Sequence, residues 1–89
     1  MVTVIVSHEC KDFSEWRKAF DAHEEFRAKA GFKIAGVYQC VEDSNYVVLI
    51  GEAPDAETIS GFMANPELKE LMEQAGVVGK PEVTVLNKA

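Results

Sequence analysis

Two histidines, His8 and His23, are the side chains of this sequence that best suit proton transfer near neutral pH. His8 ends a run in which every second residue from Val2 onward is valine, so it closes the more apolar face of a predicted strand. Trp16, one turn into the next predicted helix, is expected at the same corner. A neutral imidazole beside an indole at a cavity mouth could act as a general base or orient a polar ligand. We predict His8 as a catalytic residue, with a hydrogen bond to a loop carbonyl as the alternative interpretation.

His23 lies within the apolar stripe of the predicted helix, one turn beyond Phe20. A polar group on a buried stripe needs a hydrogen-bond partner. If the partner is a ligand, His23 is the second candidate catalytic residue. If the partner is Tyr38 or Tyr46 of the sheet, His23 is an ordinary core histidine.

The two histidines are not expected to form a direct pair. A rise of about 1.5 Å per residue places His23 roughly 16 Å along the helix from its start at Asp12, while His8 stays at the beginning of the helix. The two side chains could still contact opposite ends of one elongated ligand. No third ligand follows either histidine at helical spacing, so we predict no metal site.

Cys10 and Cys40 show neither a CxxC spacing nor histidines at zinc-finger offsets. We place Cys10 in a loop and Cys40 in a strand, and a third strand should separate their backbones by about 10 Å, which disfavours a disulfide. Both are expected to be reduced thiols. The sequence also lacks GxGxxG, Walker A, GxSxG and HExxH motifs. We therefore predict no cofactor, whether metal, haem or nucleotide.

Aromatic and methionine side chains are the candidates for holding a flat organic ligand, because they are apolar and adapt to its shape. The predicted ligand-binding residues are Trp16, Phe20, Tyr38, Phe62 and Met72. Each of them also suits ordinary core packing, which is the competing interpretation.

The elements that position these residues follow from hydrophobic periodicity and from end signals. Asp12 begins a helix, with Glu15 at the spacing of a capping box, and the apolar stripe continues to Ala30. A second helix follows Pro54-Asp55, restarts at Asn65-Pro66 and stops at Gly76. Strands are predicted at Val2–Ser7, Phe32–Val41, Tyr46–Ala53 and Glu82–Leu86, with a polar hairpin turn at 42–45.

The order of these elements is βαββαβ, which predicts an α+β ferredoxin-like sandwich. Its antiparallel sheet would have the strand order 4-1-3-2, with both helices on one face. A chain of 89 residues has the size of one domain, so we predict a single domain over residues 1–89.

Charge and hydropathy limit the partners of this chain. A net charge of −6 disfavours binding to nucleic acid or to an anionic membrane surface. The beginning of the chain lacks the basic residues and long apolar run of a signal peptide, and no stretch reaches the roughly 20 apolar residues of a spanning helix. We expect a cytoplasmic protein with no nucleic-acid or membrane partner.

The predicted strands are apolar on both faces, and the segment Tyr46–Ile50 shows this best. Such strands are normally covered on both sides, whereas the helices cover only one. A second copy of the sheet is the simplest cover for the other side, so we predict a homodimer. We assign Val47 and Leu49 to the face away from the helices. The alternative is a monomer with an unusually apolar sheet.

Three motifs accompany the βαββαβ order: Asp12-Phe13-Ser14-Glu15-Trp16, Phe20-Asp21-Ala22-His23, and Ala75-Gly76-Val77 ahead of Pro81-Glu82-Val83. With these motifs the chain resembles the dimeric α+β barrel superfamily, in which two such sheets face each other to close a barrel. The similarity is nearest to small stand-alone members labelled antibiotic-biosynthesis-monooxygenase-like or cyclase-like. It implies a cofactor-independent monooxygenase, cyclase or isomerase acting on a small aromatic or polyketide-like compound. A non-catalytic small-molecule-binding or structural dimer is the alternative.

Overall fold

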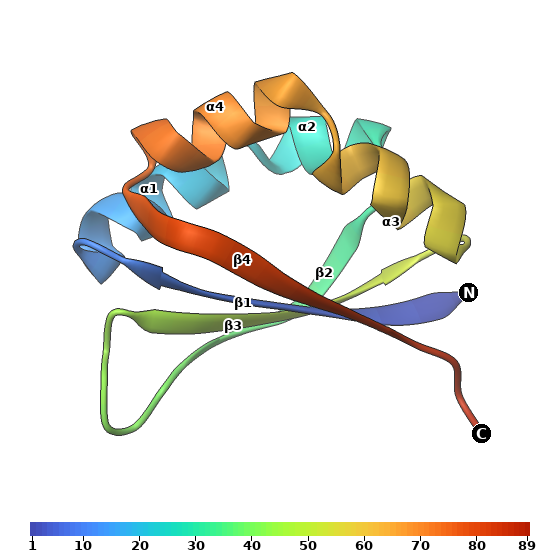
Figure 1. Ribbon diagram of the computed structural model, residues 1–89, viewed down its shortest axis with the longest axis horizontal. Coiled ribbons are helices and arrows are strands. Elements are labelled where there is room, and N and C mark those ends of the chain that lie inside the picture. The colour runs from blue at the N-terminus through green and yellow to red at the C-terminus, as the bar shows by residue number, and fades with distance from the viewer.

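The computed structural model describes residues 1–89 and contains four strands in one antiparallel sheet of order β2-β3-β1-β4. This is the predicted order, read from the other edge. The helices all lie on one face of the sheet, and the other face carries none (Figure 1). The predicted ferredoxin-like sandwich is confirmed. The strands are β1 (Val2–Cys10), β2 (Lys33–Gln39), β3 (Tyr46–Ala53) and β4 (Val77–Leu86).

Four short helices form the second layer, and side-chain caps begin three of them. Asp12 accepts a hydrogen bond from Ser14 N at 2.9 Å, and Asp55 accepts one from Thr58 N at 2.8 Å. Asn65 caps the last helix directly before a proline, as its sequence signal predicts. None of the helices is long and apolar enough to span a membrane. The helices are α1 (Phe13–Ala22), α2 (Glu24–Lys29), α3 (Ala56–Met63) and α4 (Pro66–Gln74).

The first predicted helix is not continuous, because it breaks at His23. The backbone of His23 has φ −108° and ψ 24°, outside the helical region, and its N–H bonds to Phe20 O at 3.2 Å. The capping box is also only half formed. Asp12 caps the helix, but the Glu15 carboxylate pairs with Lys18 at 3.5 Å instead of bonding back to the cap.

Two strands are longer than predicted. β1 runs on to Cys10, and β4 begins at Val77, where Val77 and Val78 pair with Cys10 and Glu9 although a loop was predicted over 77–81. The pairing of β1 with β4 shifts register between Ser7 and Glu9. Gly79 lies on the β4 side of this shift and has a φ of +74°, a conformation that glycine tolerates best. As a result Cys10 is buried in a strand rather than in a loop. Cys40 is exposed beyond the end of β2 rather than within a strand, and both thiols are free.

The hydrophobic core lies between the helices and the side of the sheet that faces them. The β1–β3 register sets Val6 opposite Leu49 and His8 opposite Val47, so these side chains share the helix-facing side. The assignment of Val47 and Leu49 to the opposite face is therefore wrong. Both faces of this segment are apolar, so its own pattern did not distinguish them, and only the pairing with β1 does. Ile59 and Phe62 of α3 pack onto this face and complete the centre of the core.

The side of the sheet without helices, called the open face below, is apolar at its centre. Ile5 pairs with Ile50 there, and Tyr38 pairs with Val48. Tyr38 is 55 % exposed. The apolar residues of the open face are Ile5, Tyr38, Tyr46, Val48, Ile50, Val78 and Leu86.

Candidate functional site

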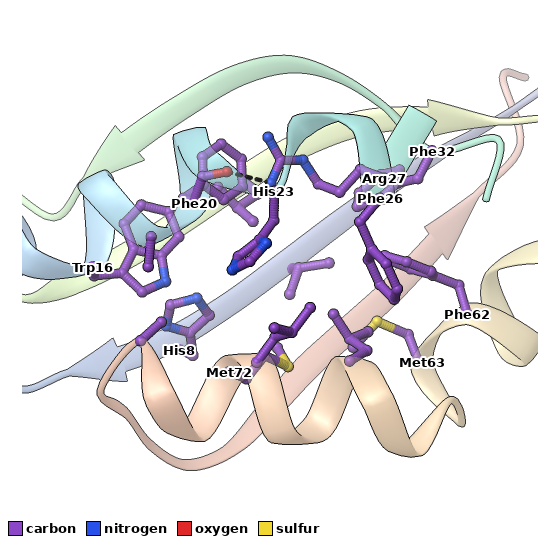
Figure 2. Close-up of a pocket in the computed structure, with 16 residues that line it drawn as sticks. His8, Trp16, Phe20, His23, Phe26, Arg27, Phe32, Phe62, Met63 and Met72 are labelled. Carbon is purple, nitrogen blue, oxygen red and sulfur yellow. Dashed lines mark hydrogen bonds between the residues drawn. The ribbon is translucent and has the colours of Figure 1, made fainter. Parts of the chain in front are cut away.

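A cavity of about 80 Å³ lies between the two pairs of helices and the sheet (Figure 2). Strands β1 and β3 supply its floor, α1 and α2 one side, and α3 and α4 the other. Sixteen residues line it, and thirteen of these are hydrophobic. Such an apolar enclosure with few polar groups is the usual form of a small-molecule site. Its volume is well below the roughly 300–1,000 Å³ of typical ligand pockets, which limits any ligand to one ring at most.

Trp16 forms one wall of the cavity, as predicted from its place near the beginning of the helix. The residue is only 3 % exposed, and its indole stacks on Phe20 with ring centroids 4.8 Å apart. Its ring also lies 5.4 Å from that of His8, tilted by 59°. The predicted pairing of imidazole and indole at this corner is therefore present.

His8 is buried, with 4 % of its surface exposed, and it lines the cavity floor. Its Nδ1 lies 3.3 Å from the carbonyl oxygen of Glu9. A carbonyl oxygen can only accept, so Nδ1 carries the proton and Nε2 keeps a lone pair. Burial lowers the pKa of His8 below its usual value, and the hydrogen bond to Glu9 offsets part of this effect. The imidazole is thus held neutral, with one nitrogen free to accept a proton.

His23 lines the same cavity as His8, and Figure 2 shows both imidazoles on the Trp16 side. The sequence predicted that both side chains could contact one ligand without forming a direct pair, and a shared cavity is compatible with that prediction. The hydrogen bond of His8 is to Glu9 and not to His23, so they do not form a direct dyad.

Arg27 also lines the cavity, although it was not among the site residues predicted from the sequence. Its Nη1 donates to the carbonyl oxygen of Phe20 at 2.7 Å, the bond drawn as a dashed line in Figure 2. The guanidinium carbon lies 3.6 Å from the centroid of the Phe20 ring, which is a close cation–π contact. Burial is the main cause that lowers the pKa of Arg27. The signal available in the sequence was its position four residues after His23, on the cavity-facing stripe.

The remaining predicted ligand-binding residues divide into two groups. Phe20, Phe62 and Met72 line the cavity. Tyr38 does not, because a β-bulge between Ile34 and Gly36 shifts the alternation of β2. That shift places Tyr38 opposite Val48 on the open face, so it cannot be the partner of His23.

Asn45 holds the corner that carries His8 and Trp16, although the sequence marked it only as a turn residue. Its Oδ1 accepts a hydrogen bond from Phe13 N at 2.9 Å, and its Nδ2 donates to Lys11 O at 3.4 Å. Its carbonyl oxygen accepts from the backbone N–H and the thiol of Cys10, at 2.8 and 3.2 Å. One residue thus joins the β2–β3 turn to the connection between β1 and α1.

Comparison with known proteins gives structural matches only. No protein-family model matches the chain, and no curated protein is similar to it in sequence. A candidate antibiotic biosynthesis monooxygenase from Bordetella bronchiseptica superposes with a TM-score of 0.79 at 13 % identity, over 99 % of this chain and 96 % of that one. A conserved protein from Methanosarcina mazei gives 0.73 at 18 % identity, over 99 % and 92 %. The Mycobacterium tuberculosis protein Rv0793 gives 0.68 at 20 % identity, over 99 % and 94 %.

These matches define the class of fold. The chain has a ferredoxin-like fold of the kind seen in proteins described as antibiotic biosynthesis monooxygenases, and the coverage is nearly complete on both sides. The resemblance noted from the sequence is confirmed at this level. At such low identity a shared fold does not carry a shared reaction, so the function has to be argued from the cavity.

Proposed function

We propose that this protein binds a small aromatic compound in the cavity and that His8 removes a proton from it. The observation that carries the proposal is the neutral imidazole whose Nδ1 is bonded to Glu9 O, which leaves Nε2 as a base within an apolar enclosure. Trp16 and Phe20 supply flat walls for the ring of the ligand. His23 and Met72 also line the cavity.

The reaction we propose is a cofactor-independent oxygenation. His8 takes the proton of a hydroxyl group, and the resulting electron-rich ring transfers electrons to O₂. For a quinol the balance is one quinol plus one O₂ giving one hydroxyquinone plus one water. O₂ is then reduced fully, with one oxygen atom in the product and the other in water. The description of several structural neighbours as candidate antibiotic biosynthesis monooxygenases supports this choice over isomerisation or cyclisation.

Oxygen uptake with methylhydroquinone as the probe tests the proposal. The protein should accelerate uptake above the rate of autoxidation, and added catalase should return no more oxygen than in the protein-free control, because the protein-dependent reaction forms water rather than peroxide. His8→Gln should reduce the protein-dependent rate about 100-fold or more, the usual contribution of a general base. Uptake equal to autoxidation, or unchanged by His8→Gln, would contradict the proposed role of His8.

A non-catalytic binding protein is the second candidate, and one observation favours it. The hydrogen bond of His8 is to the backbone of its own neighbour, and no carboxylate orients the ring as in many acid–base sites. A one-ring aromatic compound that changes Trp16 fluorescence but is recovered unchanged would support this reading.

We also propose that the protein is a homodimer whose two open faces pack together in a closed barrel. The open face exposes Tyr38, Val78 and Leu86, and no helix covers it. Apolar patches of this kind mark association surfaces, and a small domain gains stability from covering them. The resemblance to the dimeric α+β barrel superfamily supports the same arrangement.

A single hydrophobic core supports one domain over residues 1–89. We propose a cytoplasmic protein, and the two free thiols, Cys10 and Cys40, are of the kind that persist in a reducing compartment.

A further inference from the structure

The polar groups of the cavity are all of one chemical type. Apart from its thirteen hydrophobic residues, the lining consists of His8, His23 and Arg27, and no acidic side chain is present. The chain as a whole has the opposite bias, with fifteen acidic residues against nine lysines and arginines. A cavity whose polar side chains all carry nitrogen, none of them acidic, is suited to an anionic ligand.

Arg27 is the one group in this lining that carries a permanent positive charge. It is half-buried, and its side chain forms no ion pair: the two ion pairs of the structure are Arg17–Asp21 and Lys18–Glu15. Glu24 and Asp21 lie near enough to favour the positive charge of Arg27, but neither forms an ion pair with it. Arg27 instead donates to Phe20 O, and most of its N–H groups keep their hydrogen-bonding capacity.

The position of the guanidinium is fixed before any ligand binds. The 2.7 Å bond to Phe20 O and the close packing on the Phe20 ring hold it at the end of α1. A planar guanidinium matches the two oxygens of a carboxylate, and a charge-assisted bond of this kind is stronger when partly shielded from water. Holding the group in advance also reduces the entropy lost on binding.

We propose that the cavity binds a one-ring aromatic carboxylate, with the carboxylate on Arg27 and the ring against Trp16 and Phe20. This inference rests on the proposed function and names its substrate class. The hydroxyl or acidic C–H of the ligand would then face His8. The competing explanation is that Arg27 has a structural role only, tying α2 to the end of α1 through Phe20 O.

Binding of benzoate and of its neutral analogue benzamide tests the inference. The chain has a single tryptophan, so fluorescence reports on Trp16 alone, and calorimetry gives an independent Kd. Benzoate should bind the wild-type protein at least about 10-fold more tightly than benzamide, as expected for a hydrogen bond to a charged group. Arg27→Gln should bring the two Kd values within about 2-fold, and Arg27→Lys should retain part of the difference.

Arg17→Gln is the matched control. Arg17 lies on α1, and its guanidinium carbon is 5.9 Å from the centroid of the Phe20 ring. Unlike Arg27 on α2, it is exposed and does not line the cavity. Removing its charge should leave the preference for benzoate intact. If Arg17→Gln and Arg27→Gln reduce the preference equally, the effect is one of net charge and the inference is wrong.

The outcomes separate this inference from the proposed function. If benzamide and benzoate bind the wild-type protein equally, the cavity holds aromatic compounds but Arg27 does not select an anion, and only the inference is overturned. If neither compound perturbs Trp16 or gives heat, the ligand cavity itself is wrong. If Arg27→Gln does not fold, the wild-type ratio and the Arg27→Lys variant decide the question without it.

Discussion

At the scale of single residues, the burial of His8 has a consequence for stability as well as for chemistry. Burial lowers the pKa of His8 in the folded protein, whereas in the unfolded chain it returns to about 6.5. As pH falls through about 6.5, the unfolded state takes up a proton that the folded state does not, so the free energy of unfolding decreases. Above that range both states are neutral at this position, and His8 contributes no pH dependence.

We therefore expect wild-type protein to be less stable at pH 5.5 than at pH 7.5, with a smaller difference in His8→Gln. Urea denaturation followed by circular dichroism at the two pH values measures both. An identical loss of stability in the two proteins would show that His8 does not titrate in this way.

The sequence predicted the face and the neighbour of His8, but it did not predict Arg27. Alternating valines define which side of β1 is apolar, and His8 falls on it whatever the details of the fold. The direction of the Arg27 side chain depends on the break at His23 and on its hydrogen bond to the carbonyl oxygen of Phe20, which also accepts from His23 N. Neither feature has a local signature in an amphipathic helix, so this residue emerged only from the structure.

At the scale of elements, the corner between β1 and α1 depends on Asn45. Its side chain accepts the hydrogen bond of Phe13 N, one of the amide groups that a helix cannot satisfy at its own beginning. Asn45→Ala should therefore lower the free energy of unfolding by about 1–2 kcal/mol, since it leaves this donor without a partner. It should also shift the emission of Trp16, which lies one turn further on.

Ser44→Ala is the matched control for Asn45→Ala, because it changes the same turn and the structure records a bond only to the Ser44 backbone oxygen. Thermal unfolding and tryptophan emission should be close to wild type in this variant. Equal effects of the two substitutions would mean that the turn as a whole, and not the amide of Asn45, holds the corner.

Element order and type followed from periodicity, and three of the errors occurred where one residue interrupts that periodicity. The bulge between Ile34 and Gly36 moves Tyr38 to the open face, and the irregularity around Gly79 extends β4 beyond the predicted strand. The break at His23 divides one predicted helix into two. The two strand irregularities are defined by the register with a neighbouring strand, so a local pattern does not reveal them.

At the scale of the whole molecule, a substitution to aspartate should have different effects on the two faces of β3. Val47 is fully buried against the helices, whereas Val48 points to the open face. Val47→Asp should prevent folding by placing an unpaired charge in the core. Val48→Asp should leave a folded protomer that no longer associates, because the charge would be buried only in the dimer.

Light scattering and circular dichroism distinguish these results. Wild-type protein at micromolar concentration should have about twice the protomer mass of 9.8 kDa, and Val48→Asp should have the protomer mass with native helix content. Ser60→Asp adds the same charge on the exposed side of α3 and should remain dimeric. A wild-type protein with the mass of one chain would remove the closed barrel from the proposal.

Pairing of the open faces would also couple stability to concentration. If unfolding separates the two chains, mass action raises the melting temperature as the protein is concentrated. An unfolding enthalpy of roughly 0.7 kcal/mol per residue over two chains gives an increase of about 4 °C for a tenfold rise in concentration. Val48→Asp should melt at one temperature at every concentration, because its unfolding involves a single chain. Calorimetry over a concentration series measures this, and a wild-type melting temperature that does not change would mean that the open face is stable in water without a partner.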